Sequence, residues 1–181
     1  LVAAAARLAA GLGLRVALDV FAPSLARAVG QDLGALAPMA ELTKSMLYLG
    51  THGPAGMAHE LLGLERWMVA GGVDAPADVL ADIIGHDLPG PDELGGDQLP
   101  TAVLERQMER LIRVAGDSAA VGIDAVRMSD VAVLDDDGLR AAVRHVASRG
   151  IPVVLSWDLW HITDARLRIV AEAVAADPGD D

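Results

Sequence analysis

Two apolar runs of this sequence each carry a carboxylate. Asp19 stands among branched aliphatic side chains in residues 16–23, and Asp158 occupies a similar place in residues 153–160. Glycoside hydrolysis uses two carboxyl groups that flank the scissile bond, roughly 5–10 Å apart. The pattern therefore makes Asp19 and Asp158 the candidate catalytic residues, with Asp124 a weaker candidate because it lies in the middle of its strand. Asp19 and Asp158 need not be adjacent but could converge at one end of the fold.

Aromatic and cationic side chains near these runs could hold a substrate. The chain has one Phe, one Tyr, one Lys and three Trp, so the places of these few side chains are informative. A ring offers a flat face to the C–H side of a sugar. A buried lysine needs a carboxylate partner, and Asp19 on a neighbouring strand is the natural partner for Lys44. The candidate substrate-binding residues are Phe21, Lys44, Tyr48, Arg127, Trp157 and Trp160.

These side chains also have structural interpretations. Asp19 could be a buried carboxylate paired with Lys44 or Arg127, and the rings could simply fill the core. Arg127 alternates with Ile123 and Ala125, which would point it inward, where it could form a structural ion pair.

Strands that end at a common edge must position these residues. Alternating and apolar patterns predict strands over 14–21, 43–48, 120–128 and 151–157. Periodicity and capping residues predict helices over 1–12, 24–29, 31–40, 57–69, 74–84, 100–115, 135–148 and 163–176. Strands that alternate with helices indicate a parallel sheet and an α/β fold.

The first strand has two different sides. Ala17, Asp19 and Phe21 share one side, and Leu18 and Val20 share the other. Helices should cover the aliphatic side, which leaves Asp19 and Phe21 near the carboxyl end of the strand, where barrel folds place their chemistry.

Composition limits the class of protein. With 181 residues and 52% hydrophobic content, the chain suits one partial barrel domain over residues 1–176, with a Gly/Pro/Asp-rich loop over 85–99 and a frayed tail over 177–181. The net charge of −12 argues against nucleic acid or an anionic membrane surface as a partner. The apolar segment over residues 1–12 is too short to span a bilayer. The lack of cysteine excludes disulfides and leaves the compartment open.

Cofactor and metal motifs are missing from the sequence. No G-x-G-x-x-G follows a strand, and no G-x-x-x-x-G-K occurs. The five histidines lack zinc-ligand spacing, and His52 and His161 are expected to be solvated loop residues. The expectation is therefore no cofactor, no metal and an unphosphorylated substrate.

Four strand–helix units make half of an eight-stranded barrel. A half-barrel exposes two strand edges and an open face. Either an amino-terminal half precedes Leu1, or two copies of the chain associate.

Three segments resemble a known family. Asp19-Val-Phe21, Gly30-Gln-Asp-Leu33 and Lys44-Ser-Met-Leu-Tyr48 are similar to the D-V-F…G-Q-D…P-M-x-Y pattern of a glycoside hydrolase-like family of bacterial (β/α)₈ barrels. The pattern is more distantly similar to the chitinase-like glycoside hydrolase family 18. The resemblance implies that the chain is the carboxyl-terminal half of a TIM-type (β/α)₈ barrel, strands five to eight. It also implies that the main catalytic acid ends strand four, before Leu1.

The leading functional expectation is a carbohydrate-active barrel, a glycoside hydrolase relative that acts on a neutral glycan. One alternative is a non-catalytic sugar-binding or structural half-barrel. Another is a different barrel enzyme with an unphosphorylated substrate.

Overall fold

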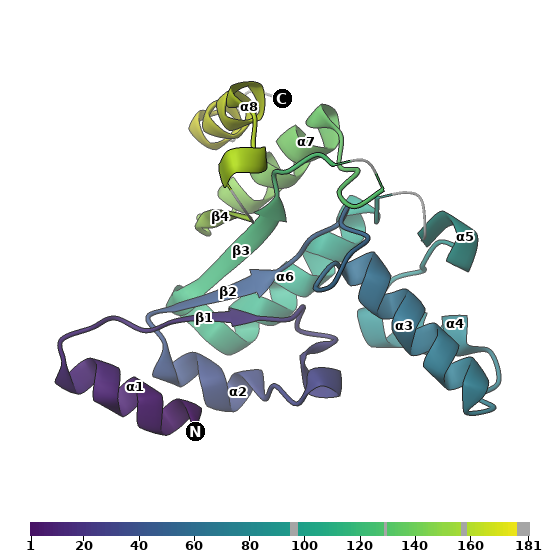
Figure 1. The fold of residues 1–181 in the computed structure, drawn as a ribbon, viewed down its shortest axis with the longest axis horizontal. Coiled ribbons are helices and arrows are strands. Elements are labelled where there is room, and N and C mark those ends of the chain that lie inside the picture. Colours follow the sequence, from purple (N-terminus) through teal and green to yellow (C-terminus); the bar gives the residue numbers. More distant parts are fainter. Residues whose placement is uncertain (95–97, 129, 157–158, 177–181) are drawn as a thin grey trace.

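The computed structural model describes residues 1–94, 98–128, 130–156 and 159–176. In these residues four parallel strands form one sheet, in the order β1 (Ala17–Val20), β2 (Leu42–Met46), β3 (Ala119–Asp124) and β4 (Val153–Ser156). The strands follow one another across the sheet in chain order, and helical segments separate successive strands (Figure 1). The predicted α/β class with a parallel sheet is therefore confirmed.

The helices lie near the predicted positions. They are α1 (Val2–Gly11), α2 (Leu33–Leu36), α3 (Met57–Ala70), α4 (Pro76–Ile84), α5 (Pro91–Leu94), α6 (Thr101–Ala115), α7 (Asp136–Ala147) and α8 (Asp164–Ala175). Short 3₁₀ segments are η1 (Ala26–Val29), η2 (Ala37–Met39), η3 (Gly116–Ser118) and η4 (Leu159–His161). Two expectations need correction, because the loop over 85–99 contains the single turn α5 and the third strand ends at Asp124 rather than at residue 128.

Local hydrogen bonds explain where several helices begin. The Asp135 carboxylate accepts from the Gly138 N–H at 2.7 Å at the start of α7, and the Thr163 hydroxyl accepts from the Arg166 N–H at 3.3 Å at the start of α8. Such caps satisfy backbone donors that have no partner within the helix. Ser24, the first residue of the helix predicted over 24–29, does not cap η1, because its hydroxyl donates to Gln107.

One side of the sheet faces the core. Val121 and Ile123 of β3 belong to the main hydrophobic cluster, with which α6 and α7 pack, and α6 lies behind the sheet in Figure 1. Val20 of β1 packs with Leu33 of α2 in a smaller cluster. This confirms that helices cover the aliphatic side of β1.

The other side of the sheet, here called the open side, carries Asp19, Lys44 and Gly122. Parallel register pairs Asp19 with Lys44, and Met46 with Gly122, and paired residues of parallel strands point to the same side. Along β2 the burial alternates, with Lys44 and Met46 half-buried on the open side.

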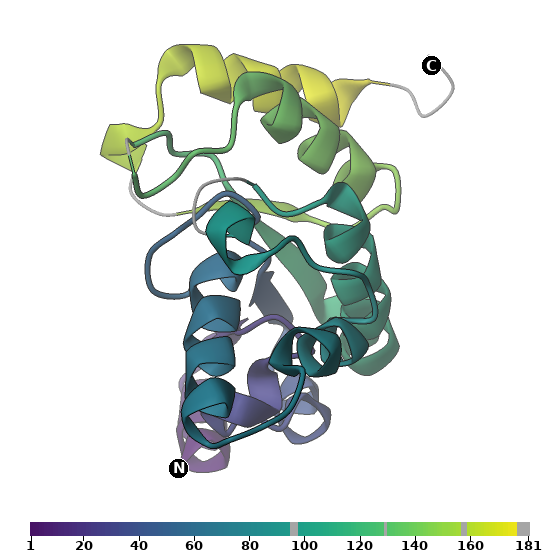
Figure 2. The same ribbon diagram turned by 90° about the vertical axis from the view of Figure 1, so that its right-hand side faces the viewer.

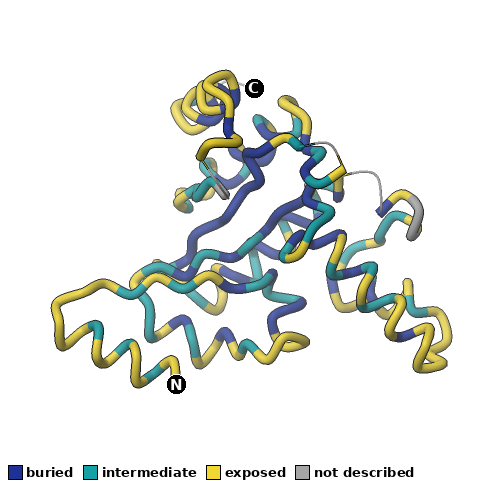
Figure 3. Tube along the Cα trace, in the orientation of Figure 1, coloured by how far each residue is buried: buried dark blue, intermediate teal, exposed yellow. Residues whose placement is uncertain are grey.

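The helices differ in how they are packed. α7 and α8 lie side by side (Figure 2), and α3 and α4 extend beyond the carboxyl ends of the strands. α1 contains no buried residue, and Figure 3 shows it exposed or half-exposed throughout, in contrast to β3. No helix in the described part of the chain is long and apolar enough to cross a membrane.

Candidate functional site

An ion pair on the open side joins the first two strands. The Lys44 ammonium donates to the Asp19 carboxylate at 2.9 Å, as the sequence predicts. The Asp19 side chain is 62% exposed, whereas that of Lys44 is 13% exposed. An ionised carboxylate can accept about four hydrogen bonds, so Asp19 keeps acceptor positions that face solvent.

Lys44 remains a cation in this setting. Burial alone would lower its pKa, but the hydrogen bond from Lys44 to Asp19 and the neighbouring Tyr48 and Asp19 outweigh burial and raise the pKa above its usual value. A lysine nucleophile needs a lowered pKa. Lys44 is therefore suited to donating hydrogen bonds and unsuited to forming a Schiff base.

Tyr48 lies against the sheet rather than projecting from it. The residue is only 4% exposed, and a Cβ atom added at Gly122 would stand 3.1 Å from the Tyr48 Cε1 atom and 3.4 Å from its hydroxyl oxygen. Gly122 thus makes room for the ring. In this arrangement Tyr48 presents no free face for sugar stacking, and its hydroxyl is the group that can act beside Lys44.

The loop after β1 gives a structural role to Phe21 and to the Gly-Gln-Asp segment of residues 30–32. Phe21 is half-buried; its N–H donates to the Gln31 side-chain oxygen at 2.8 Å and its carbonyl accepts from the Ser45 hydroxyl at 3.3 Å. Asp32 caps α2 by accepting from the Gly34 N–H. The Gly-Gln-Asp segment therefore fixes the chain that follows the strand.

The remaining predicted residues are dispersed. Arg127 follows the end of β3 and is exposed, and the Ile123 and Ala125 with which it alternates belong to the helix-side core. The inward orientation expected for Arg127 from that alternation is wrong. Trp160 lies in η4 and is 93% exposed. Trp157 and Asp158 lie outside the described residues.

Asp124, at the carboxyl end of β3, forms a buried polar site. One oxygen of its carboxylate accepts from the Gly50 N–H at 2.9 Å and from the Thr51 hydroxyl at 3.1 Å. Burial raises its pKa from 3.8 to about 6, because these hydrogen bonds offset the desolvation only in part. Asp124 is 1% exposed and therefore does not face solvent. Its hydrogen bonds to Gly50 and Thr51 hold the loop after β2 in place.

Arg166 of α8 is buried near Asp124. Its guanidinium donates to the Leu134 carbonyl at 2.9 Å and lies 3.7 Å from the Asp136 carboxylate. Burial lowers the pKa of Arg166, against the pull of the Asp136 and Asp124 charges. The second Asp124 oxygen and two guanidinium nitrogens of Arg166 have no hydrogen-bond partner in the described structure. No local sequence pattern indicates that Arg166 lies near Asp124, because 42 positions of the chain separate them.

His52 is half-buried, and its ring contains buried atoms that no sequence pattern indicated. Both of its ring nitrogens are buried and lack a hydrogen-bond partner among the described residues, so the expectation of a solvated loop histidine is wrong. His52, His59 and Arg66 line a cavity of about 290 Å³ beside α3. Within the described ranges no three His, Asp or Glu side chains gather as metal ligands.

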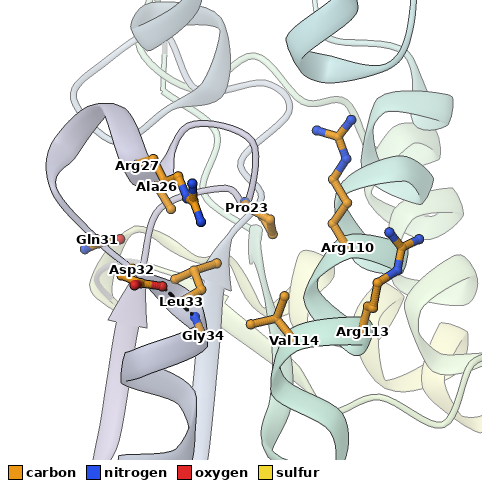
Figure 4. Close-up of a pocket in the computed structure, with 10 residues that line it drawn as sticks. All are labelled: Pro23, Ala26, Arg27, Gln31, Asp32, Leu33, Gly34, Arg110, Arg113 and Val114. Atoms are coloured by element: carbon orange, nitrogen blue, oxygen red, sulfur yellow. Dashed lines mark hydrogen bonds between the residues drawn. The ribbon is translucent and has the colours of Figure 1, made fainter.

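A second cavity, of about 280 Å³, lies on the helix side of the sheet. Figure 4 shows Arg27 on one wall and Arg110 and Arg113 of α6 on the other, with Pro23 between them. We refer to it as the arginine cavity. No sequence pattern indicates it, because its walls are far apart along the chain.

Comparison of the chain with protein-family models, curated protein sequences and solved structures found no match.

Proposed function

We propose that this chain is the carbohydrate-binding, carboxyl-terminal half of a (β/α)₈ barrel related to glycoside hydrolases, with a neutral glycan as its ligand. The Asp19–Lys44 ion pair on the open side of the sheet carries the proposal. The pair offers a carboxylate acceptor and an ammonium donor side by side, which suits adjacent hydroxyl groups of a sugar.

The sheet topology supports the barrel part of the proposal. The strands follow one another in chain order and are all parallel, whereas a doubly wound sheet reverses its order at a switch point. β1 and β4 each lack a second neighbour among the described strands. An amino-terminal half-barrel, or a second copy of this chain, would pair with these two edges.

The second candidate function is a binding role without catalysis. It is favoured because Asp124, the described carboxyl group with a raised pKa, is buried. A general acid must reach the glycosidic oxygen while it is protonated near neutral pH. Asp124 has a raised pKa, but Gly50 and Thr51 hold it out of reach of a ligand. In the catalytic version of the proposal Asp19 and Asp158 act, together with an acid from the other half of the barrel.

Binding of neutral oligosaccharides tests the proposal. We would titrate the isotope-labelled chain with glucose-, N-acetylglucosamine-, xylose- and galactose-based oligomers and follow backbone amide shifts by NMR. One of these series should perturb the amides of Asp19, Lys44 and Tyr48. Lys44→Met should weaken that binding at least about tenfold, equivalent to about 1.4 kcal/mol, because it removes the ammonium donor.

Arg168→Gln is the matched control, since Arg168 is exposed on α8 and its loss changes the net charge equally. It should leave binding unchanged. If no neutral oligosaccharide perturbs the open side at millimolar concentration, the proposal fails. Because the catalytic version needs an acid from the other half of the barrel, release of reducing ends is measured with that half present. Release that Asp19→Asn abolishes would assign the enzyme, and binding without release would assign the binding module.

A further inference from the structure

We propose that the arginine cavity binds a phosphate monoester with a small organic group. The cavity lies between η1 and α2 on one wall and α6 on the other. It lies on the helix side, away from the Asp19–Lys44 pair, so the ligand would be distinct from the glycan.

Cations without carboxylate partners gather here. The chain has 26 acidic residues against 14 basic ones, and basic groups such as Arg15, Lys44 and Arg149 pair with carboxylates. In the described part of the chain Arg27 and Arg113 form neither an ion pair nor a side-chain hydrogen bond, and Arg110 bonds only to the Ser24 hydroxyl and the Ile83 carbonyl.

The local charge of the cavity is opposite to that of the molecule. Its lining carries three arginines and a single carboxylate, Asp32, which already accepts the Gly34 N–H at the start of α2. A net charge of −12 repels anions in general. An anion-binding site on this protein therefore needs a local cluster of positive charges. The planar guanidinium group of arginine matches the geometry of phosphate oxygens.

The size and floor of the cavity favour a small ester. A volume of about 280 Å³ lies just below the usual range for ligand pockets, which favours a small ligand. Pro23, Leu33 and Val114 supply apolar surface between the charged walls. This apolar surface would contact the carbon atoms of an organic phosphate. Inorganic phosphate has no apolar part that could make the same contact.

The roles of the three arginines are unequal. Arg110 is fixed, because its guanidinium holds Ser24 and Ile83 and lies 3.0 Å from the position of a Cβ added at Gly85. It contributes charge to the cavity wall. Arg27 and Arg113 are exposed and can turn toward a ligand, so we assign the direct phosphate contacts to them.

NMR titration with glycerol 3-phosphate tests the assignment. At pH 7.5 a phosphate monoester carries close to two negative charges, and the ionic strength would be held constant with chloride. The ester should shift the amides of Leu33, Gly34 and Val114. The double variant Arg27→Gln/Arg113→Gln should raise the dissociation constant at least about tenfold.

The matched control is Arg7→Gln/Arg168→Gln, which removes two exposed arginines outside the cavity. This variant should change the dissociation constant less than about twofold. An equal loss in both double variants, or no shift in the three cavity amides, overturns the site. Inorganic phosphate should bind more weakly than the ester, and acetate more weakly still. Equal affinity of inorganic phosphate, or of acetate, overturns the assignment of a monoester.

Discussion

Asp124 shows how a single side chain can link the fold to pH. Its carboxyl group binds a proton more tightly in the native state than in the unfolded chain, because burial raises its pKa to about 6 from 3.8. Between about pH 4 and pH 6 the native state therefore holds more protons than the unfolded state. The free energy of unfolding should fall as the pH rises through this window.

Asp124→Asn should remove this pH dependence. A pKa difference of this size corresponds to about 3 kcal/mol. The stability of wild type relative to the variant should fall by most of that amount from pH 4 to pH 7, since the unfolded-state carboxyl group is already partly ionised at pH 4. Urea denaturation at several pH values measures it. Thr51→Val keeps the carboxyl group but removes a hydrogen bond that lowers its pKa, so the fall in stability should extend to higher pH in this variant. An identical slope in Asp124→Asn and wild type would contradict the assignment.

At the scale of the elements, one buried side chain joins three of them. Gln107 of α6 is fully buried; its oxygen accepts from the Ser24 N–H at 3.0 Å and the Ser24 hydroxyl at 2.8 Å, and its nitrogen donates to the Ile84 carbonyl at 3.3 Å. Ile84 ends α4, where carbonyl groups lack partners within the helix. Gln107 thus connects the loop after β1, α4 and α6.

Gln107→Leu should destabilise the protein by about 2–3 kcal/mol, because it leaves the Ser24 N–H and the Ile84 carbonyl unsatisfied while conserving most of the side-chain volume. Urea denaturation at pH 7 gives the change in the free energy of unfolding. Ser24→Ala removes only the hydroxyl and should cost less. A leucine variant as stable as wild type would show that water replaces these hydrogen bonds.

Sequence reasoning succeeded at the element scale where the signal is local. α7 and α8 begin where the sequence predicts, and there Asp135 and Thr163 cap N–H groups three residues away. α4 begins at Pro76, within the predicted range 74–84. The strand limits were less accurate, since the predicted strand over 120–128 stops at Asp124. The prediction continued this strand to residue 128 because the residues after Asp124 are largely apolar. Those residues belong to the packed loop that follows β3.

At the scale of the whole molecule, hydrogen exchange should reveal a graded stability. β2 and β3 each have two neighbours, whereas β1 and β4 have one in the described sheet, and α1 has no buried residue. Amides of β2 and β3 should exchange slowest, those of β1 and β4 faster, and those of α1 almost without protection. NMR-detected exchange measures each amide.

The same experiment tests whether two half-barrels associate. If copies of the chain pair through their sheet edges, protection of β1 and β4 should rise with protein concentration. The charge of −12 opposes association at low salt, so protection should also rise with salt. Protection independent of both would argue against a second copy as the partner of these edges.

The sequence by itself determined the parallel α/β architecture, the side of β1 on which Asp19 lies, and its pairing with Lys44. These follow from periodicity, since a two-residue repeat fixes which side of a strand a residue occupies. Only the tertiary structure decided how deeply each group is buried. Tyr48 and His52 were expected at accessible positions, but neighbours from distant parts of the chain cover them. The arginine cavity exists only because α6 packs beside the loop after β1, which places Arg27 and Arg113 on opposite walls of one cavity.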